Sequence, residues 1–281
     1  MRGLFFVLLE VTVMFWNVEN YFDPFDDPLK NDDDFTPEGV KHWTWRRFER
    51  KRDGIAKTII STADGVGALP VIVGLAEVEN KMVLRQLVDK SPLEGFGYGF
   101  IHRESPDRRG IDVALLYRKA AFKVFKVDSL RVKSFPTRDI LYVKGMLASG
   151  DTLHAIVVHL PSKLGGEKAS GGRRDEALAV LDSCLDSIRT VRPEAKIIVM
   201  GDFNDGPESR KEGTIKFQGV WETIDRFMVY NLNVSEAVYR PYFLLEEDKT
   251  YMGMKPRRTF IGPRYNGGLS DHLPIVLKIA P

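Results

Sequence analysis

Short runs of apolar residues recur along the chain, each well below the roughly 20 residues that a helix needs to span a membrane. The runs are rich in Val, Ile and Leu, which is typical of strands that are buried on both faces of a sheet. No transmembrane segment is predicted. We expect buried strands over residues 11–16, 71–75, 112–117, 153–159, 196–200 and 275–279.

Amphipathic helices are predicted between these strands. Phe48, Ile55 and Ile59 fall on one face of a helix whose opposite face is basic. A second apolar stripe, at three- and four-residue steps, is formed by Leu178, Leu181, Leu185 and Ile188. Strands that alternate with helices in this way are typical of an α/β protein.

Two polar segments interrupt this pattern, and we interpret both as surface loops. Residues 23–38 are dense in Asp and Pro, and residues 162–174 contain four glycines together with several charges. Because predicted strands lie on both sides of each loop, neither segment is interpreted as a linker between domains. We expect one domain over residues 1–281.

The composition is that of a folded globular chain, since 43% of the 281 residues are apolar and 28% are charged. A formal net charge of +2 creates no overall field that would attract nucleic acid, so any such attraction must be local. The one cysteine, Cys184, excludes an internal disulfide and a cysteine-based metal site. No obligate protein partner is evident, and we expect a monomer.

The amino terminus leaves the cellular location open. Arg2 and the apolar run over residues 4–9 have the character of a signal peptide, but Glu10 interrupts the run and no small-residue cleavage site follows. A cytoplasmic location and export are both compatible with this segment.

The strand predicted at 196–200 leads into candidate chemistry. Gly201 is followed by Asp202 and Asn204, and in an extended chain these two side chains point to the same side. A carboxylate beside an amide can activate water while the amide stabilises a developing oxyanion. Taken alone, such a pair more often caps a helix or a turn.

Further polar groups follow other predicted strands or precede the last one. Asp271 and His272 place an acid able to bind metal next to an imidazole that titrates near neutral pH. Asn17, Glu77 and His159 each end a predicted strand. The Glu77 carboxylate suits a hard divalent ion, although an acid after a strand also favours a helix N-terminus. We interpret these positions as one shared cleft.

These segments, in their order along the chain, resemble the endonuclease/exonuclease/phosphatase superfamily, which includes deoxyribonuclease I. The resemblance rests above all on residues 201–205 and 270–274, and its signatures span residues 16–274. The Asn-Val-Glu-Asn sequence at 17–20 is similar to a bacterial branch. The resemblance implies a deoxyribonuclease I-like four-layer α/β sandwich, with two mixed β-sheets packed face to face and helices outside.

The resemblance also implies roles for individual residues. Many family members have Gln before the metal-binding Glu, where this chain has Ala76, and that departure concerns a substrate hydrogen bond more than the metal. Asp202 is implied to orient or deprotonate water. The full implied set is His159, Asp202, Asn204, Asp225 and His272 for catalysis, Asn17, Glu77 and Asp271 for the metal, and Arg109 for substrate binding.

The implied function is hydrolysis of phosphodiester bonds by in-line attack of water, with Mg²⁺ or Mn²⁺ as cofactor. His159 favours a nuclease, whose partner is nucleic acid. The alternative is a phosphatase or phosphodiesterase of the same superfamily that acts on small molecules or lipid headgroups. A non-catalytic binding protein is the third hypothesis, and the filled polar positions count against it.

Overall fold

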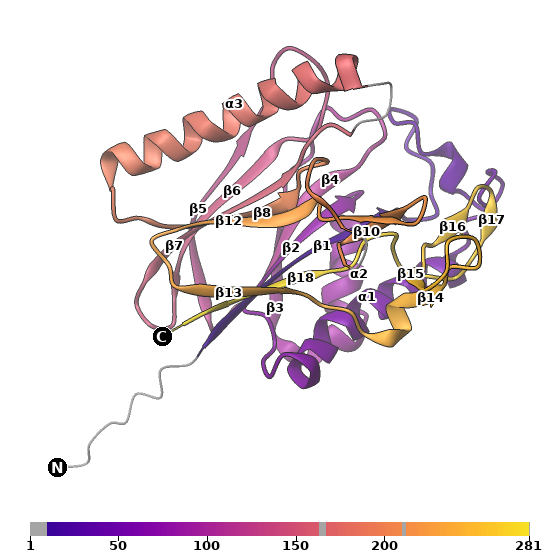
Figure 1. The fold of residues 1–281 in the computed structure, drawn as a ribbon, viewed down its shortest axis with the longest axis horizontal. Helices are drawn as coiled ribbons and strands as arrows, with labels where there is room; N and C mark the ends of the chain where they lie inside the picture. The colour runs from indigo at the N-terminus through magenta and orange to yellow at the C-terminus, as the bar shows by residue number, and fades with distance from the viewer. Residues whose placement is uncertain (1–9, 163–166, 210–211, 281) are drawn as a thin grey trace.

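Two large β-sheets lie face to face and helices cover the outer side of each, so that the molecule has four layers (Figure 1). The structure is a computed structural model that describes residues 10–162, 167–209 and 212–280. The layering confirms the sandwich that the family resemblance implies. Within the described residues, no helix combines the length and apolar character needed to cross a bilayer.

The first sheet has six strands in the order β13-β18-β1-β2-β4-β3. It is mixed, because β1 runs parallel to β2 and antiparallel to β18. Its strands are β1 (Val11–Tyr21), β2 (Ile72–Val78), β3 (Tyr98–His102), β4 (Asp112–Arg118), β13 (Val234–Val238) and β18 (Ile275–Ile279).

The second sheet has five strands in the order β12-β8-β7-β6-β5. It is also mixed, since β7 and β8 are parallel and the other pairs are antiparallel. Its strands are β5 (Phe122–Leu130), β6 (Ile140–Leu147), β7 (Thr152–His159), β8 (Lys196–Asp202) and β12 (Asp225–Tyr230).

Among the described residues, three α-helices form the outer layers. Helices α1 (Trp45–Gly65) and α2 (Lys81–Asp89) cover the first sheet, and α3 (Glu167–Val191) covers the second (Figure 1). The short strands are β9 (Glu208–Ser209), β10 (Ile215–Phe217), β11 (Val220–Glu222), β14 (Leu245–Glu247), β15 (Met254–Pro256), β16 (Phe260–Ile261) and β17 (Arg264–Tyr265), and the 3₁₀ turns are η1 (Asp33–Phe35), η2 (Pro92–Phe96) and η3 (Tyr242–Leu244).

The layers explain why the strands are apolar on both faces. Side chains alternate along β1, so Val13 and Phe15 belong to the core between the two sheets, whereas Met14 and Trp16 belong to the core under α1 and α2. A third core lies between the second sheet and α3. Continuous Val, Ile and Leu runs are therefore required in the central strands, and the expected strands are confirmed.

One expectation is wrong. The interpretation of residues 162–174 as a loop fails because α3 begins at Glu167, although residues 163–166 lie outside the described part. Gly171 and Gly172 are inside the helix, where each costs about 1 kcal/mol relative to alanine. Leu181 and Leu185 pack α3 onto the second sheet, and this burial outweighs the local propensity.

Gly201 marks a close approach between β7 and β8. It pairs with Val158, and a Cβ atom at this position would overlap the Val158 Cγ2 atom and carbonyl oxygen. We expect Gly201→Ala to lower the free energy of unfolding by about 1–3 kcal/mol, because backbone cannot yield easily. Urea unfolding measures this. Gly95→Ala is the control, since no atom lies near its added Cβ, and an equal loss in both variants would contradict the prediction.

Candidate active site

Strand register places three candidate residues side by side at one edge of the second sheet. His159 ends β7, Asp202 ends β8 and Asp225 begins β12. His159 is paired with Asp202, and Asp202 is paired with Asp225. Cross-strand partners lie about 5 Å apart on the same face of a sheet. Sheet hydrogen bonding alone therefore brings residues distant in sequence into one row.

The first sheet contributes Asn17 and Glu77 through an irregularity in its ladder. Asn17 pairs with Ala76, and the register shifts immediately afterwards in both strands. Glu77 has a positive φ of 61°, which is rare for a residue with a Cβ. Its carboxylate accepts a hydrogen bond from the Asn20 backbone N–H at 2.8 Å. Such strain concentrates at functional sites, and here it aims the carboxylate.

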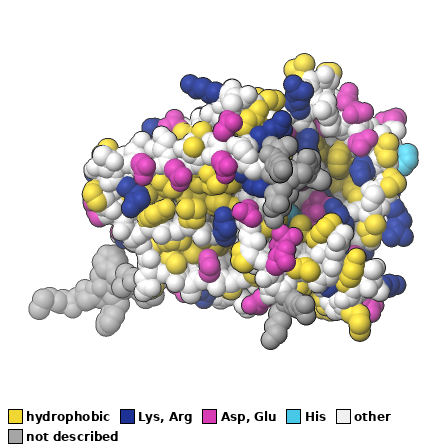
Figure 2. Space-filling model, turned by 45° about the horizontal axis from the view of Figure 1, so that its top comes forward, with side chains coloured by type: hydrophobic (Ala, Val, Ile, Leu, Met, Phe, Trp, Pro, Cys, Tyr) yellow, Lys and Arg dark blue, Asp and Glu magenta, His cyan; other side chains and the backbone are white. Residues whose placement is uncertain are grey.

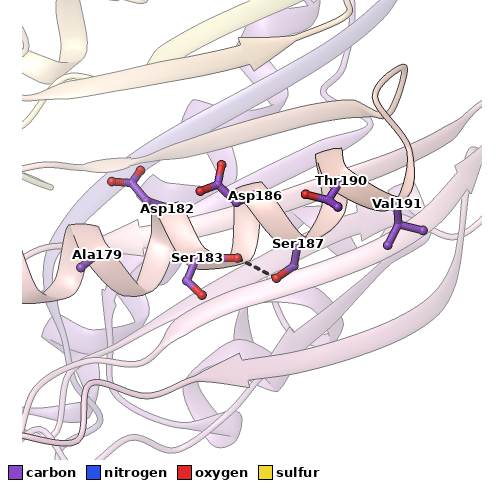
Figure 3. A pocket seen from close by; sticks show the side chains of 7 residues that line it. All are labelled: Ala179, Asp182, Ser183, Asp186, Ser187, Thr190 and Val191. Carbon is purple, nitrogen blue, oxygen red and sulfur yellow. Dashed lines mark hydrogen bonds between the residues drawn. The ribbon is translucent and has the colours of Figure 1, made fainter.

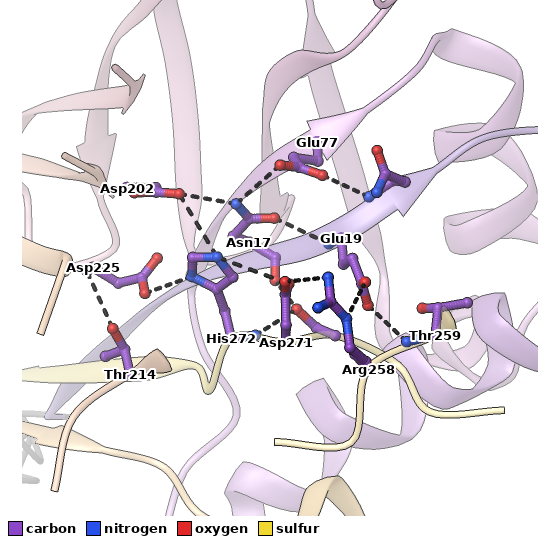
Figure 4. Close-up of polar contacts among 12 residues, drawn as sticks. Asn17, Glu19, Glu77, Asp202, Thr214, Asp225, Arg258, Thr259, Asp271 and His272 are labelled. Atoms are coloured by element: carbon purple, nitrogen blue, oxygen red, sulfur yellow. Dashed lines mark hydrogen bonds and ion pairs between the residues drawn. The ribbon is translucent and has the colours of Figure 1, made fainter. Parts of the chain in front are cut away.

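The Asn17 side chain connects the two sheets (Figure 4). Its Nδ2 donates to Asp202 Oδ2 at 3.0 Å and lies 3.5 Å from Glu77 Oε1. Its Oδ1 accepts from the Glu19 backbone N–H at 3.0 Å. The amide therefore presents its NH₂ group, and not its oxygen, to the two carboxylates.

The turn before β18 is fastened to β1 by two hydrogen bonds and braced by a third within the turn. Trp16 Nε1 donates to the His272 carbonyl oxygen at 2.9 Å, and the Ser270 hydroxyl donates to the Asn17 carbonyl oxygen at 2.6 Å. The same hydroxyl accepts from the His272 backbone N–H at 2.9 Å. The serine of the Ser-Asp-His sequence thus fixes the direction of the histidine.

His272 forms a buried pair with Asp225, whose Oδ2 lies 2.8 Å from His272 Nδ1 (Figure 4). The opposite ring nitrogen, Nε2, lies 3.9 Å from both Asp202 Oδ2 and Asp271 Oδ1. Burial opposes the charged imidazolium, but the neighbouring carboxylates, Asp225 first, raise the pKa of His272 well above its usual value. The imidazolium therefore has one N–H directed at the carboxylate cluster and free to donate.

The pKa values of Asp202 and His159 are shifted in opposite directions. Burial, followed by the charge of Asp225, raises the pKa of Asp202 to about 7. Burial, with the charges of Arg138 and Arg109, lowers the pKa of His159 well below its usual value. His159 Nε2 lies 3.6 Å from Asp202 Oδ2, and its Nδ1 is buried without a hydrogen-bond partner. A neutral imidazole therefore lies beside a carboxyl that titrates near neutral pH.

Asn204 is next to the cluster but is held differently from the sequence expectation. Its φ of 51° breaks the alternation of extended chain after Asp202. Its backbone N–H donates to Asp202 Oδ1 at 2.8 Å, and its side-chain Nδ2 donates to the Leu160 carbonyl oxygen at 2.9 Å. Asn204 thus orients the Asp202 carboxylate through its backbone.

The two sides of the cluster each carry an arginine. Arg109 donates to Asn20 Oδ1 at 2.8 Å and lies 3.8 Å from Glu77. Arg258 lies 3.0 Å from Asp271 Oδ2. Both guanidinium groups are about half exposed and within reach of a bound anion. Asp271, expected with the metal ligands, therefore faces Arg258, while Asn17 Nδ2 lies 3.5 Å from Glu77 Oε1.

Three residues near the cluster were not expected from the sequence: Glu19, Lys51 and Arg258. Lys51, buried on α1, donates to the Glu19 carbonyl oxygen, to Thr259 Oγ1 at 2.6 Å and to the Leu269 carbonyl oxygen at 2.9 Å. Glu19 accepts from the Thr259 backbone N–H at 2.7 Å and lies 3.3 Å from Arg258. Glu19 lies within the Asn-Val-Glu-Asn segment, so its sequence signal was available, whereas a lysine on a basic helix gave none.

The acidic groups fit a divalent cation. Hard cations take oxygen ligands, and the carboxylates of Glu77, Glu19 and Asp271 lie near Asn17 and His272 (Figure 4). Burial, followed by the charge of Asp271, raises the pKa of Glu19 to about 7, although nearby basic groups oppose the shift. A bound cation would stabilise the ionised form of the Glu19 carboxylate.

A surface pocket on α3 is separate from this cluster. It follows one side of the helix, and a hydrogen bond links Ser187 Oγ to the Ser183 carbonyl oxygen beside it (Figure 3). Its lining contains no histidine and none of the candidate residues: Ala179, Asp182, Ser183, Asp186, Ser187, Thr190 and Val191. On the face seen in Figure 2, Lys and Arg side chains are interspersed with Asp and Glu, as the near-neutral composition suggests.

The stacked mixed sheets and the buried Asp-His pair at their edge define a deoxyribonuclease I-like fold of the phosphoester hydrolases. The chain belongs to the endonuclease/exonuclease/phosphatase family, whose model matches residues 12–213 and 208–281. No curated protein sequence matches the chain.

Solved structures of low sequence identity share the fold. D. rerio TDP2 complexed with single-strand DNA product is 16% identical, with a TM-score of 0.57 over 97% of this chain and 99% of that chain. The Bacteroides thetaiotaomicron mannosyl-6-phosphatase is 16% identical, with a TM-score of 0.61 over 96% and 100%. The human Nocturnin catalytic domain with bound sulfate is 18% identical, with a TM-score of 0.56 over 96% and 94%.

Lys51 is expected to be a structural support of the site. Lys51→Met leaves the buried oxygen acceptors at Glu19, Thr259 and Leu269 without their shared donor, so the free energy of unfolding should fall by about 2 kcal/mol or more. Urea unfolding measures the loss. Arg46→Met on the exposed start of α1 is the control and should change stability little. Equal stability of the two variants would contradict the role of Lys51.

Proposed function

We propose that this protein is a metal-dependent phosphodiesterase that acts as a nuclease. The observation that carries the proposal is the convergence of Asp202, Asp225 and His272 from three separate segments, with one ligand atom from each lying within 4.8 Å of the others. Asn17 joins this buried cluster to Glu77. A general base, an oriented imidazolium and a metal-binding carboxylate are the groups that phosphoester hydrolysis needs.

His272 is proposed to stabilise the charge that develops on the phosphoryl oxygens. Asp225 holds Nδ1 at 2.8 Å and so fixes the ring, which leaves the N–H at Nε2 free to donate. A preorganised donor of this kind contributes about 3 kcal/mol of transition-state stabilisation. Asp225 supports the ring through its hydrogen bond and acts as a positioning residue.

Asp202 is proposed to orient the attacking water and accept its proton. The water oxygen forms a bond to phosphorus as the bond from phosphorus to the leaving oxygen breaks on the opposite side. Asn17 and the Asn204 backbone N–H hold one Asp202 oxygen each, so the carboxylate direction is fixed before substrate binds. Its buried position keeps it a competent base near neutral pH.

His159 and Arg109 are proposed to contact the phosphate. His159 directs its Nε2 at the cluster, 3.6 Å from Asp202 Oδ2, and Arg109 lies 3.8 Å from Glu77 Oε2. A Mg²⁺ or Mn²⁺ ion would be held by Glu77 with Asn17 beside it, and it would supply Lewis-acid charge stabilisation. Asp271 is proposed as a further acidic residue of the same metal site.

A nuclease is favoured over a phosphatase on two grounds. His159 Nε2 lies 3.6 Å from Asp202 Oδ2, which supports the phosphate contact that the deoxyribonuclease-like pattern implies, and one structure of the same fold holds a DNA product. The alternative is a phosphatase for small molecules or lipid headgroups. It is favoured by Arg109 and Arg258, which flank the cluster on both sides and suit a terminal phosphate group. A mannosyl phosphatase shares the fold as well.

Hydrolysis and its substrate class are tested together. Purified protein is incubated with supercoiled plasmid, bis-p-nitrophenyl phosphate or p-nitrophenyl phosphate in the presence of Mg²⁺, Mn²⁺ or EDTA. We expect metal-dependent nicking and diester cleavage, each reduced about a hundredfold or more in Asp202→Ala and in His272→Ala. His154→Ala is the matched control because His154 is buried on the far side of the second sheet, against Tyr142.

The outcomes separate the hypotheses. Monoester cleavage without nicking would replace the nuclease with the phosphatase alternative, while keeping the site. Full activity in His272→Ala would remove that residue from the mechanism. If none of the substrates is hydrolysed and circular dichroism shows that the protein is folded, a binding protein is favoured.

Glu77 is expected to set the metal requirement. Glu77→Gln keeps the size of the side chain but removes its charge, so the Mg²⁺ concentration for half-maximal activity should rise about tenfold or more. A Mg²⁺ titration of the initial rate measures it. Glu94→Gln, an exposed replacement on η2, is the control. An unchanged titration in Glu77→Gln would remove Glu77 from the metal site.

A further inference from the structure

A second cluster of side chains able to bind a metal ion lies where the β3–β4 connection joins its two strands. His102 ends β3, Asp112 begins β4, and Glu104 lies in the segment between them. One ligand atom from each of the three residues lies within 4.8 Å of the others. None of them belongs to the catalytic cluster, and the family resemblance assigns none of them a role.

The buried atoms of this cluster are unsatisfied. The His102 side chain is fully buried, and neither of its ring nitrogens has a hydrogen-bond partner. Asp112 Oδ1 accepts from the Ser105 backbone N–H, but its Oδ2 is buried without a partner. A buried polar atom that makes no hydrogen bond is costly, so these atoms call for a binding partner that the protein itself does not supply.

The geometry brings the unsatisfied atoms together. His102 Nε2 lies 3.2 Å from Asp112 Oδ2, close enough for a hydrogen bond, yet the two make none. Glu104 Oε1 lies 3.7 Å from His102 Nδ1, and its side chain is more than half exposed and free to swing. Burial raises the pKa of Glu104, and although His102 opposes the shift, the Asp112 charge adds to it. The side chains of His102, Glu104 and Asp112 therefore lie close together, in an arrangement that a bound cation would stabilise.

We propose that His102, Glu104 and Asp112 bind a divalent transition-metal ion of the Zn²⁺ type. An imidazole nitrogen with two carboxylate oxygens suits Zn²⁺ and its neighbours in the first transition row, whereas Mg²⁺ and Ca²⁺ take oxygen ligands. Water fills the remaining coordination positions on the exposed side, where Glu104 lies. The site is thus distinct in ligand chemistry from the one at Glu77.

The consequence is a fixed connection between β3 and β4. This connection carries Arg109, which reaches Asn20 and Glu77. Lys30 already holds the connection from outside by donating to the Ser105 and Asp107 carbonyl oxygens. A metal ion bound by His102 and Asp112 would clamp its two ends, so that the ion stabilises the segment and takes no part in the reaction.

Cobalt absorption tests the site directly, because Co²⁺ substitutes for Zn²⁺ and absorbs visible light. A four-coordinate Co²⁺ site with a nitrogen ligand absorbs strongly, whereas a six-coordinate oxygen site absorbs weakly. EDTA-stripped protein is titrated with Co²⁺ and then with Zn²⁺. We expect one equivalent of strongly absorbing Co²⁺ that Zn²⁺ displaces, and a melting temperature that rises by about 5 °C at a hundred times the dissociation constant.

Variants assign the signal to its residues. Glu104→Gln alters an exposed side chain that the fold does not need, and it should weaken Co²⁺ binding about tenfold or more. His102→Asn should abolish the strong absorption, whereas Glu77→Gln, on the catalytic side, and His154→Asn should both retain it. These last two variants separate this site from the catalytic metal and from histidine binding in general.

Two results would overturn the proposal. One is stripped protein that binds no strongly absorbing Co²⁺ and gains no thermal stability from Zn²⁺, which would make the cluster a buried His102–Asp112 ion pair. The other is Co²⁺ absorption that persists unchanged in His102→Asn and in Glu104→Gln.

Discussion

The site depends on one amide that spans the gap between two sheets. Asn17 ends the regular part of β1 in the first sheet, and its Nδ2 donates to Asp202 in the second. Between their facing surfaces the sheets meet through apolar side chains, which hold layers together but do not specify how their edges align. A directional hydrogen bond at the rim adds that specification. It brings Glu77 from one sheet beside Asp202 from the other.

The electrostatic surroundings shift the pKa values of two buried histidines in opposite directions. Burial lowers the pKa of both rings, but the contact with Asp225 raises that of His272 above its usual value, whereas the charges of Arg138 and Arg109 lower that of His159 further. Pairs of titratable groups with opposed environments are the mark of assigned acid and base roles. The backbone contributes as well, since Glu19, Glu77 and Asn204 all adopt positive φ values near the cluster.

Sequence patterns predicted the central strands, because burial on both faces leaves a direct trace, and the family resemblance implied the sandwich. The motifs made His159, Asp202 and His272 candidates for one cleft, and the structure brings the three close together. Half-exposed strands such as β5 were not predicted, since they contain few buried apolar residues and so give a weak sequence pattern. The helical start of α3 was missed because tertiary packing overcame its glycines. Lys51 and Arg258 were missed for another reason: their partners at Glu19 and Asp271 are joined to them by folding alone.

The pairing of β1 with β18 has a consequence for how the molecule is made. The strand that carries Asn17 lies in the centre of its sheet only after residues some 256 positions later have been added, as the Trp16–His272 hydrogen bond shows. During synthesis on the ribosome, β1 therefore remains an exposed edge, open to pairing with other chains until the last strand emerges. Contacts so distant in sequence also slow folding. The order of synthesis delays assembly of the site until β18 has been made.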